Sequence, residues 1–103
     1  FPRKTIKNIQ IINAYLKTIN CSYYYVLQPI RKKDREKIIK EYEKLKIELV
    51  KFDKEEKNFS YYDHSDLFDI SRNIFFDRCH IGDKGNLIIA ENLSEIILTR
   101  FKL

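Results

Sequence analysis

The sequence predicts an α/β protein with a parallel sheet. Segments with helical periodicity alternate with short aromatic or β-branched runs, in the order helix, strand, helix, strand, irregular segment, helix. This alternation is typical of βαβ units. The first strand candidate, residues 23–27, is apolar throughout, as expected of a strand buried on both faces. Hydrophobic residues make up 44% of the chain and charged residues 34%, which is a globular composition.

The first helix is expected over residues 4–18, because aliphatic residues recur every three to four positions and form one stripe. The stripe consists of Ile6, Ile9, Ile12, Leu16 and Ile19. A strand is expected next, over residues 23–27. Because Pro29 has no backbone N–H for a sheet ladder, this strand should end near Gln28.

A second helix is expected from residue 34 to about residue 52, again with one apolar stripe. The stripe consists of Ile38, Tyr42, Leu45, Leu49 and Phe52. A short aromatic strand is expected at residues 59–62, followed by polar turn residues. The last helix should begin at Asp83 or Gly85 and end near Arg100. Its inner side is expected to consist of Ile89, Leu93, Ile96 and Ile97.

Two strands are too few for the layers that these helices require. A strand that is apolar on both faces needs a neighbour on each edge, and three helices over two strands give a poor core. A further short extended segment is expected at residues 73–77, and the chain contains no methionine and begins with Phe1. We therefore expect residues 1–103 to be the C-terminal part of a single domain, with an incomplete parallel sheet completed by an N-terminal remainder.

The net charge of +5 is concentrated in the first half of the chain, where residues 1–57 hold 15 basic and 8 acidic side chains. The densest basic run, residues 31–37, is expected to be the solvated start of a helix, although such a patch can also attract polyanions. The tyrosines at 23–25 lie in an apolar run and are expected in the core, so no nucleic-acid partner is expected. No apolar run approaches the roughly 20 residues of a membrane span.

A carboxylate and an imidazole stand three residues apart, at Asp77 and His80, just before a glycine-containing turn. Histidine suits general-base chemistry because its pKa lies near neutrality, and a carboxylate that accepts a hydrogen bond from its second nitrogen fixes the tautomer. Both side chains are expected at the carboxyl end of the sheet, where open α/β proteins place their sites. The spacing leaves two interpretations open: a base with its orienting acid, or a structural brace.

The stretch FFDRCHIGDKGNLIIAE, residues 75–91, resembles the last conserved block of the SGNH (GDSL-type) hydrolases. That block has an apolar residue, Asp-x-x-His, a short turn, Gly-Asn, an apolar pair and Ala-Glu before a helix. The matching residues here are Phe76, Asp77, His80, Gly85, Asn86, Ile88, Ile89, Ala90 and Glu91. Upstream, YYYVLQP (23–29) and YYDHSDLFD (61–69) resemble segments that precede the block in bacterial members. The resemblance therefore spans essentially the whole chain.

The resemblance implies a flavodoxin-like three-layer α/β/α fold and a serine esterase with a Ser-His-Asp triad, in which His80 is the general base and Asp77 its acid. The family's serine and oxyanion donors lie in glycine-containing blocks, and no glycine precedes Gly82. These parts are expected in the N-terminal remainder, so the chain by itself should be inactive. The implied substrate is an acylated small molecule or glycan, with no cofactor.

Other interpretations concern the same segments. In a non-catalytic binding or scaffold module, Asp77 and His80 would brace the turn and residues 31–37 would contact polyanions. A metal site is not expected, because the adjacent Cys79 and His80 are awkward ligands for one tetrahedral ion. Residues 63–69 lack the glycine and terminal glutamate of a calcium loop and are expected to form a polar loop. The cysteines leave the compartment, cytoplasmic or cell envelope, open.

Overall fold

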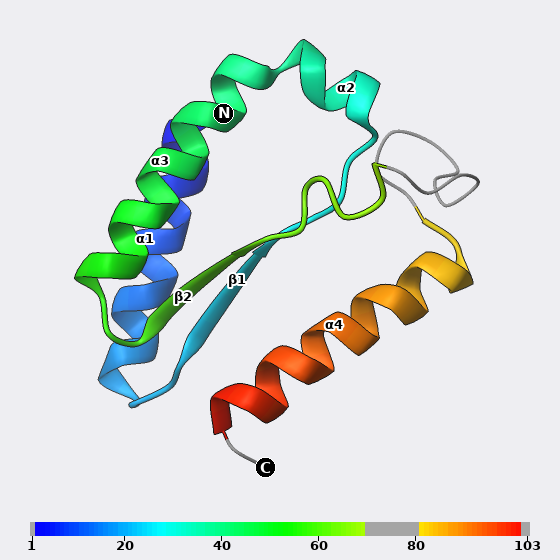
Figure 1. Cartoon of the computed structure of the whole chain (residues 1–103). Coiled ribbons are helices and arrows are strands. Elements are labelled where there is room, and N and C mark those ends of the chain that lie inside the picture. The colour runs from blue at the N-terminus through cyan, green and yellow to red at the C-terminus, as the bar shows by residue number, and fades with distance from the viewer. Residues whose placement is uncertain (1, 70–80, 102–103) are drawn as a thin grey trace.

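The computed structural model describes residues 2–69 and 81–101 (Figure 1). Along the chain, the elements are α1 (Pro2–Thr18), β1 (Tyr23–Leu27), α2 (Lys32–Lys37), α3 (Ile39–Glu55), β2 (Phe59–Asp63) and α4 (Asp83–Phe101). Within the described residues, the sheet consists of β1 and β2, which pair in parallel with Tyr23 opposite Phe59 and Leu27 opposite Asp63. The expected mixed α/β character and parallel pairing are therefore confirmed.

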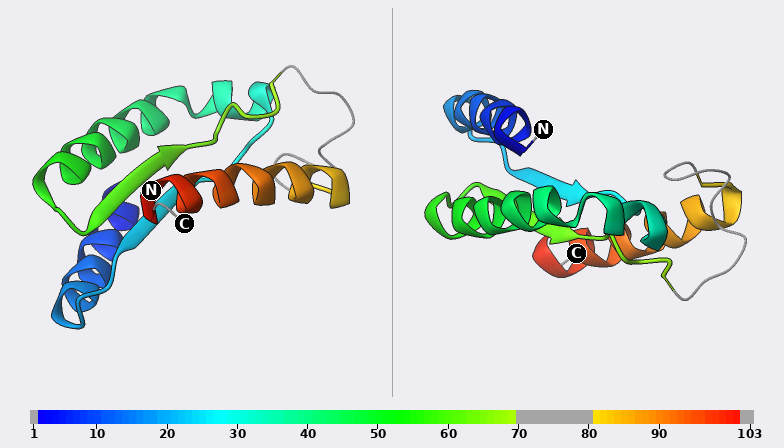
Figure 2. Two further views of the ribbon diagram at one scale, coloured as in Figure 1. Left: turned by 60° about the horizontal axis from the view of Figure 1, so that its bottom comes forward. Right: turned by 90° about the horizontal axis from the view of Figure 1, so that it is seen from above.

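The two faces of the strands lie against different helices. Figure 1 shows α1 and α3 on one side of the strands and α4 on the other, and the left view of Figure 2 shows β2 between α3 and α4. On the α3 side, Phe59 contacts Tyr23 and Phe52 edge to face, with ring centroids 5.2 and 4.8 Å apart. On the α4 side, the Arg100 guanidinium carbon lies 6.0 Å from the centroid of the Tyr24 ring.

The core lies between the strands and α3. Its most deeply buried apolar side chains are Leu45, Leu49 and Phe59, which are at most 1% exposed. The predicted stripe of the second helix is confirmed, because Tyr42, Leu45 and Leu49 are buried and its two outer members pack against them. Side chains four and seven residues apart share one face of a helix, which is why this stripe could be read from the sequence.

The predicted single helix over 34–52 is wrong in one respect: it is divided into α2 and α3 at Ile38. The backbone of Ile38, with φ −123° and ψ 30°, is outside the helical range and interrupts the helix. The interruption gives α2 a direction different from α3 (Figure 1). As a result, α2 reaches over the carboxyl ends of the strands, while α3 runs back along them.

The predicted stripe of α1 is only partly buried. Ile9 is in the core, but Ile12 and Ile19 are 45% and 55% exposed. In their place Asn13 is buried, because its Oδ1 accepts a hydrogen bond of 2.8 Å from Nδ2 of Asn58. A polar side chain can be buried at low cost when such a partner is present, and the α1 sequence does not show that partner.

The helix α4 is apolar on more than one side. Its predicted inner residues Ile89, Leu93 and Ile96 are half-buried, whereas Ile97 is 42% exposed, contrary to expectation. Leu87 and Leu98 are also exposed, at 60% and 50%. No helix in the described ranges combines the length and apolar character of a membrane span. A helix that is apolar all round is typical of one covered on several sides, so α4 has more apolar surface than the described residues cover.

We expect Leu49→Ala to lower the free energy of unfolding by about 2–5 kcal/mol, because it leaves a cavity at a completely buried position. Urea denaturation followed by circular dichroism measures this change. Ile47→Ala is the matched control on the same helix, since Ile47 is 65% exposed, and it should change the free energy by less than about 0.5 kcal/mol. Equal effects of the two substitutions would contradict this description of the core.

Candidate functional site

The predicted base His80 and its predicted acid Asp77 lie outside the described residues, as do Cys79 and the expected extended segment at 73–77. The described chain stops at residue 69 and resumes at residue 81. Figure 1 shows both of these ends beyond the carboxyl ends of the strands, near α2 and the start of α4. The segment after β2 and the start of α4 are the described parts of the chain on either side of these residues.

An Asx turn directs the chain as it leaves β2. Asp63 Oδ1 accepts hydrogen bonds from the backbone N–H of Ser65 at 2.9 Å and from its hydroxyl at 2.6 Å. The backbone N–H of His64 donates to the carbonyl of Leu27 at 3.0 Å, and that of Ile30 donates to the carbonyl of Ser65 at 3.2 Å. The turn is thus joined by backbone hydrogen bonds to the segment after β1, and both strands end in one shared structure.

Arg35 connects α2 to this turn. Its Nη1 donates to the carbonyl of Ser65 at 2.9 Å, to that of Ile30 at 3.3 Å and to Asp69 Oδ1 at 2.9 Å. Its Nη2 donates to Asp69 Oδ2 at 2.5 Å, which completes a bidentate pair, and the side chain is only 11% exposed. The hydrogen bond from Arg35 lowers the pKa of Asp69 below its ordinary value. One guanidinium therefore holds the backbone and the end of segment 63–69.

A second charged group lies where β2 ends. Lys46 Nζ lies 3.1 Å from Asp63 Oδ2. Burial would raise the pKa of Asp63, but hydrogen bonds from Ser65 and Lys46 outweigh it and lower that pKa below its ordinary value. Burial, and then the charge of Asp63, raise the pKa of the Tyr61 phenol. At neutral pH this group therefore consists of an ionised carboxylate and a protonated phenol, and neither is suited to act as a general base.

His64 and Ser65 are buried next to one another, but they are not arranged as base and nucleophile. His64 is 9% exposed, and its Nδ1 has no hydrogen-bond partner among the described residues. The hydroxyl of Ser65 already donates to the carboxylate of Asp63. This hydrogen bond stabilises the turn and does not activate the serine as a nucleophile. The expected polar loop at 63–69 is thus a turn held by hydrogen bonds from Ser65 and Arg35.

Part of the charge of the basic run at 31–37 is paired with carboxylates. Arg31 Nε lies 2.7 Å from Asp34 Oδ2, and Lys37 Nζ lies 3.9 Å from Asp34 Oδ1. Arg35 is turned inward against the turn after β2, whereas Lys32, Lys33 and Lys37 remain exposed, with the Lys37 side chain 74% exposed. As expected, the run forms a helix start without buried residues.

Sequence reasoning did not identify Arg35 or Lys46 as organisers of this region. Arg35 and Asp69 are 34 residues apart, and no local pattern marks such a pair. Within residues 2–69 and 81–101 there is no group of three histidine, cysteine or acidic side chains that could hold a metal ion. Comparisons with protein-family models, curated proteins and solved structures find no match for this chain.

We expect Arg35→Gln to raise the pKa of Asp69 toward the ordinary value of about 3.9 and to lower the free energy of unfolding at pH 7 by about 1–3 kcal/mol. Because the folded-state pKa of Asp69 is depressed, its contribution to stability is present above the unfolded pKa and is lost as the pH falls through the folded pKa. Wild-type stability should therefore fall more steeply below about pH 4 than that of the variant.

Carboxyl-carbon NMR titration and urea denaturation between pH 7 and pH 2.5 measure these two effects. Arg31→Gln is the matched control, because Arg31 pairs with Asp34 and does not contact Asp69. It should leave the titration of Asp69 unchanged. An Asp69 carboxyl that titrates identically in wild type and Arg35→Gln would refute the assigned contact.

Proposed function

We propose that this chain is the C-terminal part of an SGNH-type serine hydrolase with a flavodoxin-like α/β/α fold. Its reaction is the hydrolysis of an ester or O-acetyl group on an acylated small molecule or glycan. The observation that carries the proposal is the block from Asp77 to Glu91, in which Asp-x-x-His is followed by Gly-Asn and Ala-Glu at the start of a helix. His80 acts as the general base and Asp77 orients it.

The described residues around the block support this proposal. The helix α4 begins at Asp83, three residues after His80, and the backbone N–H of Asn86 donates to the carbonyl of Gly82 at 2.9 Å. Gly85 is buried in this first turn, whereas Asn86 is exposed. The Gly-Asn pair of the block thus lies in the first turn of α4, the position that the resemblance implies. The parallel strands and the helices on either side agree with a doubly wound arrangement.

The proposed chemistry assigns one proton path to these residues. His80 takes the proton of the serine hydroxyl as its oxygen attacks the substrate carbonyl, and Asp77 stabilises the resulting imidazolium. The imidazolium of His80 then gives that proton to the leaving alcohol as the ester C–O bond breaks, and an acyl-serine remains. Water then attacks the acyl group, His80 takes the proton of the water, and the serine regains it as the acid leaves. The serine comes from the N-terminal remainder of the domain.

For the complete protein, we expect His80→Ala to lower kcat/KM for p-nitrophenyl acetate by about 10³-fold or more, because the base of a triad acts together with its nucleophile. Asp77→Asn should lower it by about 10²–10⁴-fold. Initial rates at pH 7.5 measure both changes. Asp66→Asn is the matched control, since it removes an exposed carboxylate from the neighbouring turn, and it should leave the rate unchanged.

A fluorophosphonate probe provides an independent test, because it labels only a serine that has been activated as a nucleophile. The complete protein should be labelled, and His80→Ala should be labelled far more slowly. Residues 1–103 by themselves should not be labelled. Equal turnover of p-nitrophenyl acetate by wild type and His80→Ala would refute the proposal, as would labelling of a serine within residues 1–103.

A further inference from the structure

The two edges of the sheet differ in how they are closed. The backbone N–H of Tyr23 donates to the carbonyl of Asn58 at 2.7 Å, and that of His64 donates to the carbonyl of Leu27 at 3.0 Å. These two bonds fix the alternation of the parallel ladder. The N–H and carbonyl groups of odd-numbered residues of β1 bond to those of even-numbered residues of β2. The N–H of Tyr61 therefore points away from β1, and Asp53 Oδ2 accepts it at 2.9 Å. A carboxylate from the end of α3 thus closes the outer edge of β2.

On the outer edge of β1, no charged side chain or proline of the strand itself blocks pairing with a further strand. By the same alternation, the peptide group of Val26 points away from β2, and no strand among the described residues lies on that side. The strand reads YYYVL and contains none of the charged or proline residues with which proteins usually protect an edge. Its chemistry fits another extended segment that supplies backbone N–H and carbonyl groups.

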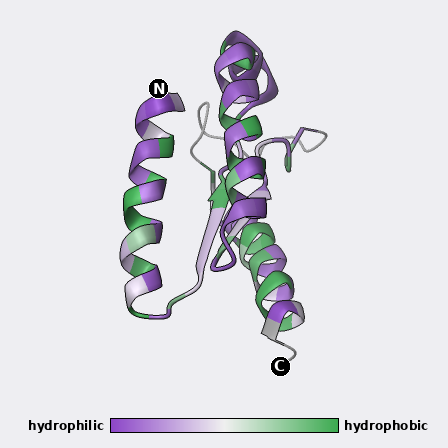
Figure 3. Cartoon of the chain, turned by 90° about the vertical axis from the view of Figure 1, so that its left-hand side faces the viewer, coloured by the Kyte–Doolittle hydropathy of each residue, from purple (hydrophilic) through white to green (hydrophobic). Residues whose placement is uncertain are grey.

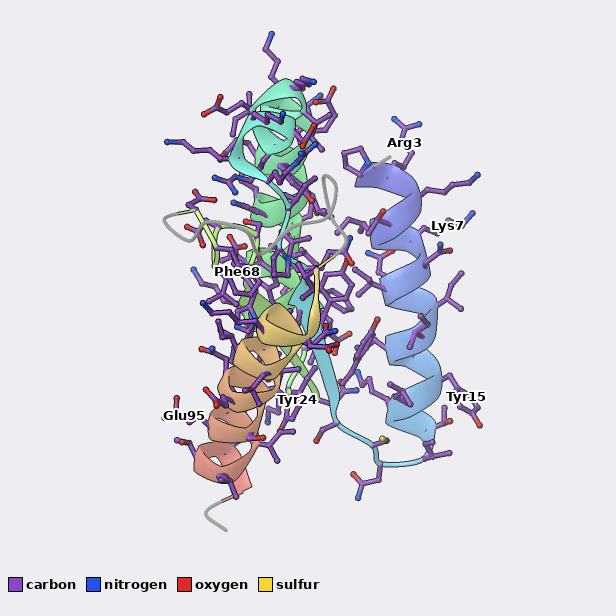
Figure 4. All side chains as sticks on the ribbon, turned by 90° about the vertical axis from the view of Figure 1, so that its right-hand side faces the viewer. Arg3, Lys7, Tyr15, Tyr24, Phe68 and Glu95 are labelled. Carbon is purple, nitrogen blue, oxygen red and sulfur yellow. The ribbon has the colours of Figure 1, made fainter. Side chains whose placement is uncertain are left out.

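The orientation of α1 shows on which side a neighbour is missing. Lys17 Nζ lies 2.9 Å from Glu56 Oε2, so one side of α1 faces the end of α3. Figure 4 shows Lys7 and Tyr15 pointing away from the strands, so the opposite face, with the buried Ile9, is turned inward. The inner face of α1 has two flanks. Lys17 lies on one flank, and Ile12 and Ile19 lie on the other. These two exposed isoleucines therefore point toward the region beyond the outer edge of β1.

The helix α1 stands to β1 as α3 stands to β2: each helix directly precedes its strand in the chain and lies on the same side of the sheet. The helix α3 leads into β2 and covers the pair that β2 forms with β1. The helix α1 leads into β1 from the same side of the sheet, and Figure 3 shows it standing apart from the strands. In right-handed parallel units the crossover helix covers the strand before it as well as the strand after it. Among the described residues, α1 has only the strand after it, β1.

From these observations we infer that the outer edge of β1 is an interface for one further strand, parallel to β1. This strand is the polypeptide that leads into α1 at Pro2, and its apolar side chains cover Ile12 and Ile19. The inference does not depend on hydrolytic chemistry, because it uses only the ladder, the position of α1 and the exposure of Ile12 and Ile19. A protein without esterase activity would still require this strand.

Amide hydrogen exchange measured by NMR on the complete gene product tests the inference. The amide of Val26 should exchange at least about 100-fold more slowly than an unprotected amide, since a hydrogen bond to the added strand must first open. The amide of Tyr61 is the matched control in the same sample. Asp53→Ala should accelerate exchange at Tyr61 and leave Val26 protected, because this carboxylate closes only the edge of β2.

Three outcomes would overturn the inference. An unprotected Val26 amide in the complete gene product would show that no strand occupies the edge. Protection that is lost on dilution, together with a change from dimer to monomer in light scattering, would assign the edge to a second copy of the chain. Protected Val26 without nuclear Overhauser contacts to residues that precede Pro2 would assign it to a different segment.

Discussion

The parallel pairing of β1 with β2 is the constraint on which the rest of this structure depends. A parallel pair cannot be joined by a tight turn, so the chain must return along the sheet, and α3 provides this return. The same pairing brings the carboxyl ends of both strands to the same end of the sheet, where α2 contacts the segment after β2. It also decides by alternation which peptide groups face the partner strand and which require another acceptor.

The elements that were predicted correctly are those in which local sequence and buried surface agree. The strand β1 ends where Pro29 requires it to end, and the stripe of α3 repeats at the helical period because one face lies on Phe59. The exceptions have distant causes. Asn13 is buried because Asn58, 45 residues away, donates a hydrogen bond to its amide oxygen. The periodicity of α1 does not predict this partner. The interruption at Ile38 likewise lies inside an unbroken apolar pattern.

The candidate site was predictable to a different extent. Residue chemistry and spacing are sufficient to select Asp77 and His80, because a base and its orienting acid can lie close together in sequence. The residues that organise the neighbouring turn cannot be found in this way. Arg35 reaches the carbonyl of Ser65 and the carboxylate of Asp69 from a helix more than 30 residues earlier. Such contacts depend on the angle between α2 and α3, which is set by one backbone conformation.

The closure of β2 by Asp53 has a consequence for the order in which the sheet is assembled. Asp53 lies near the end of α3 and is therefore synthesised a few residues before β2. When β2 pairs with β1, the acceptor for its outward N–H group is already attached to the preceding helix. Within the described residues, the outward N–H of Tyr61 is thus satisfied as soon as β2 pairs with β1, and it is no longer available to an extended segment of a neighbouring nascent chain.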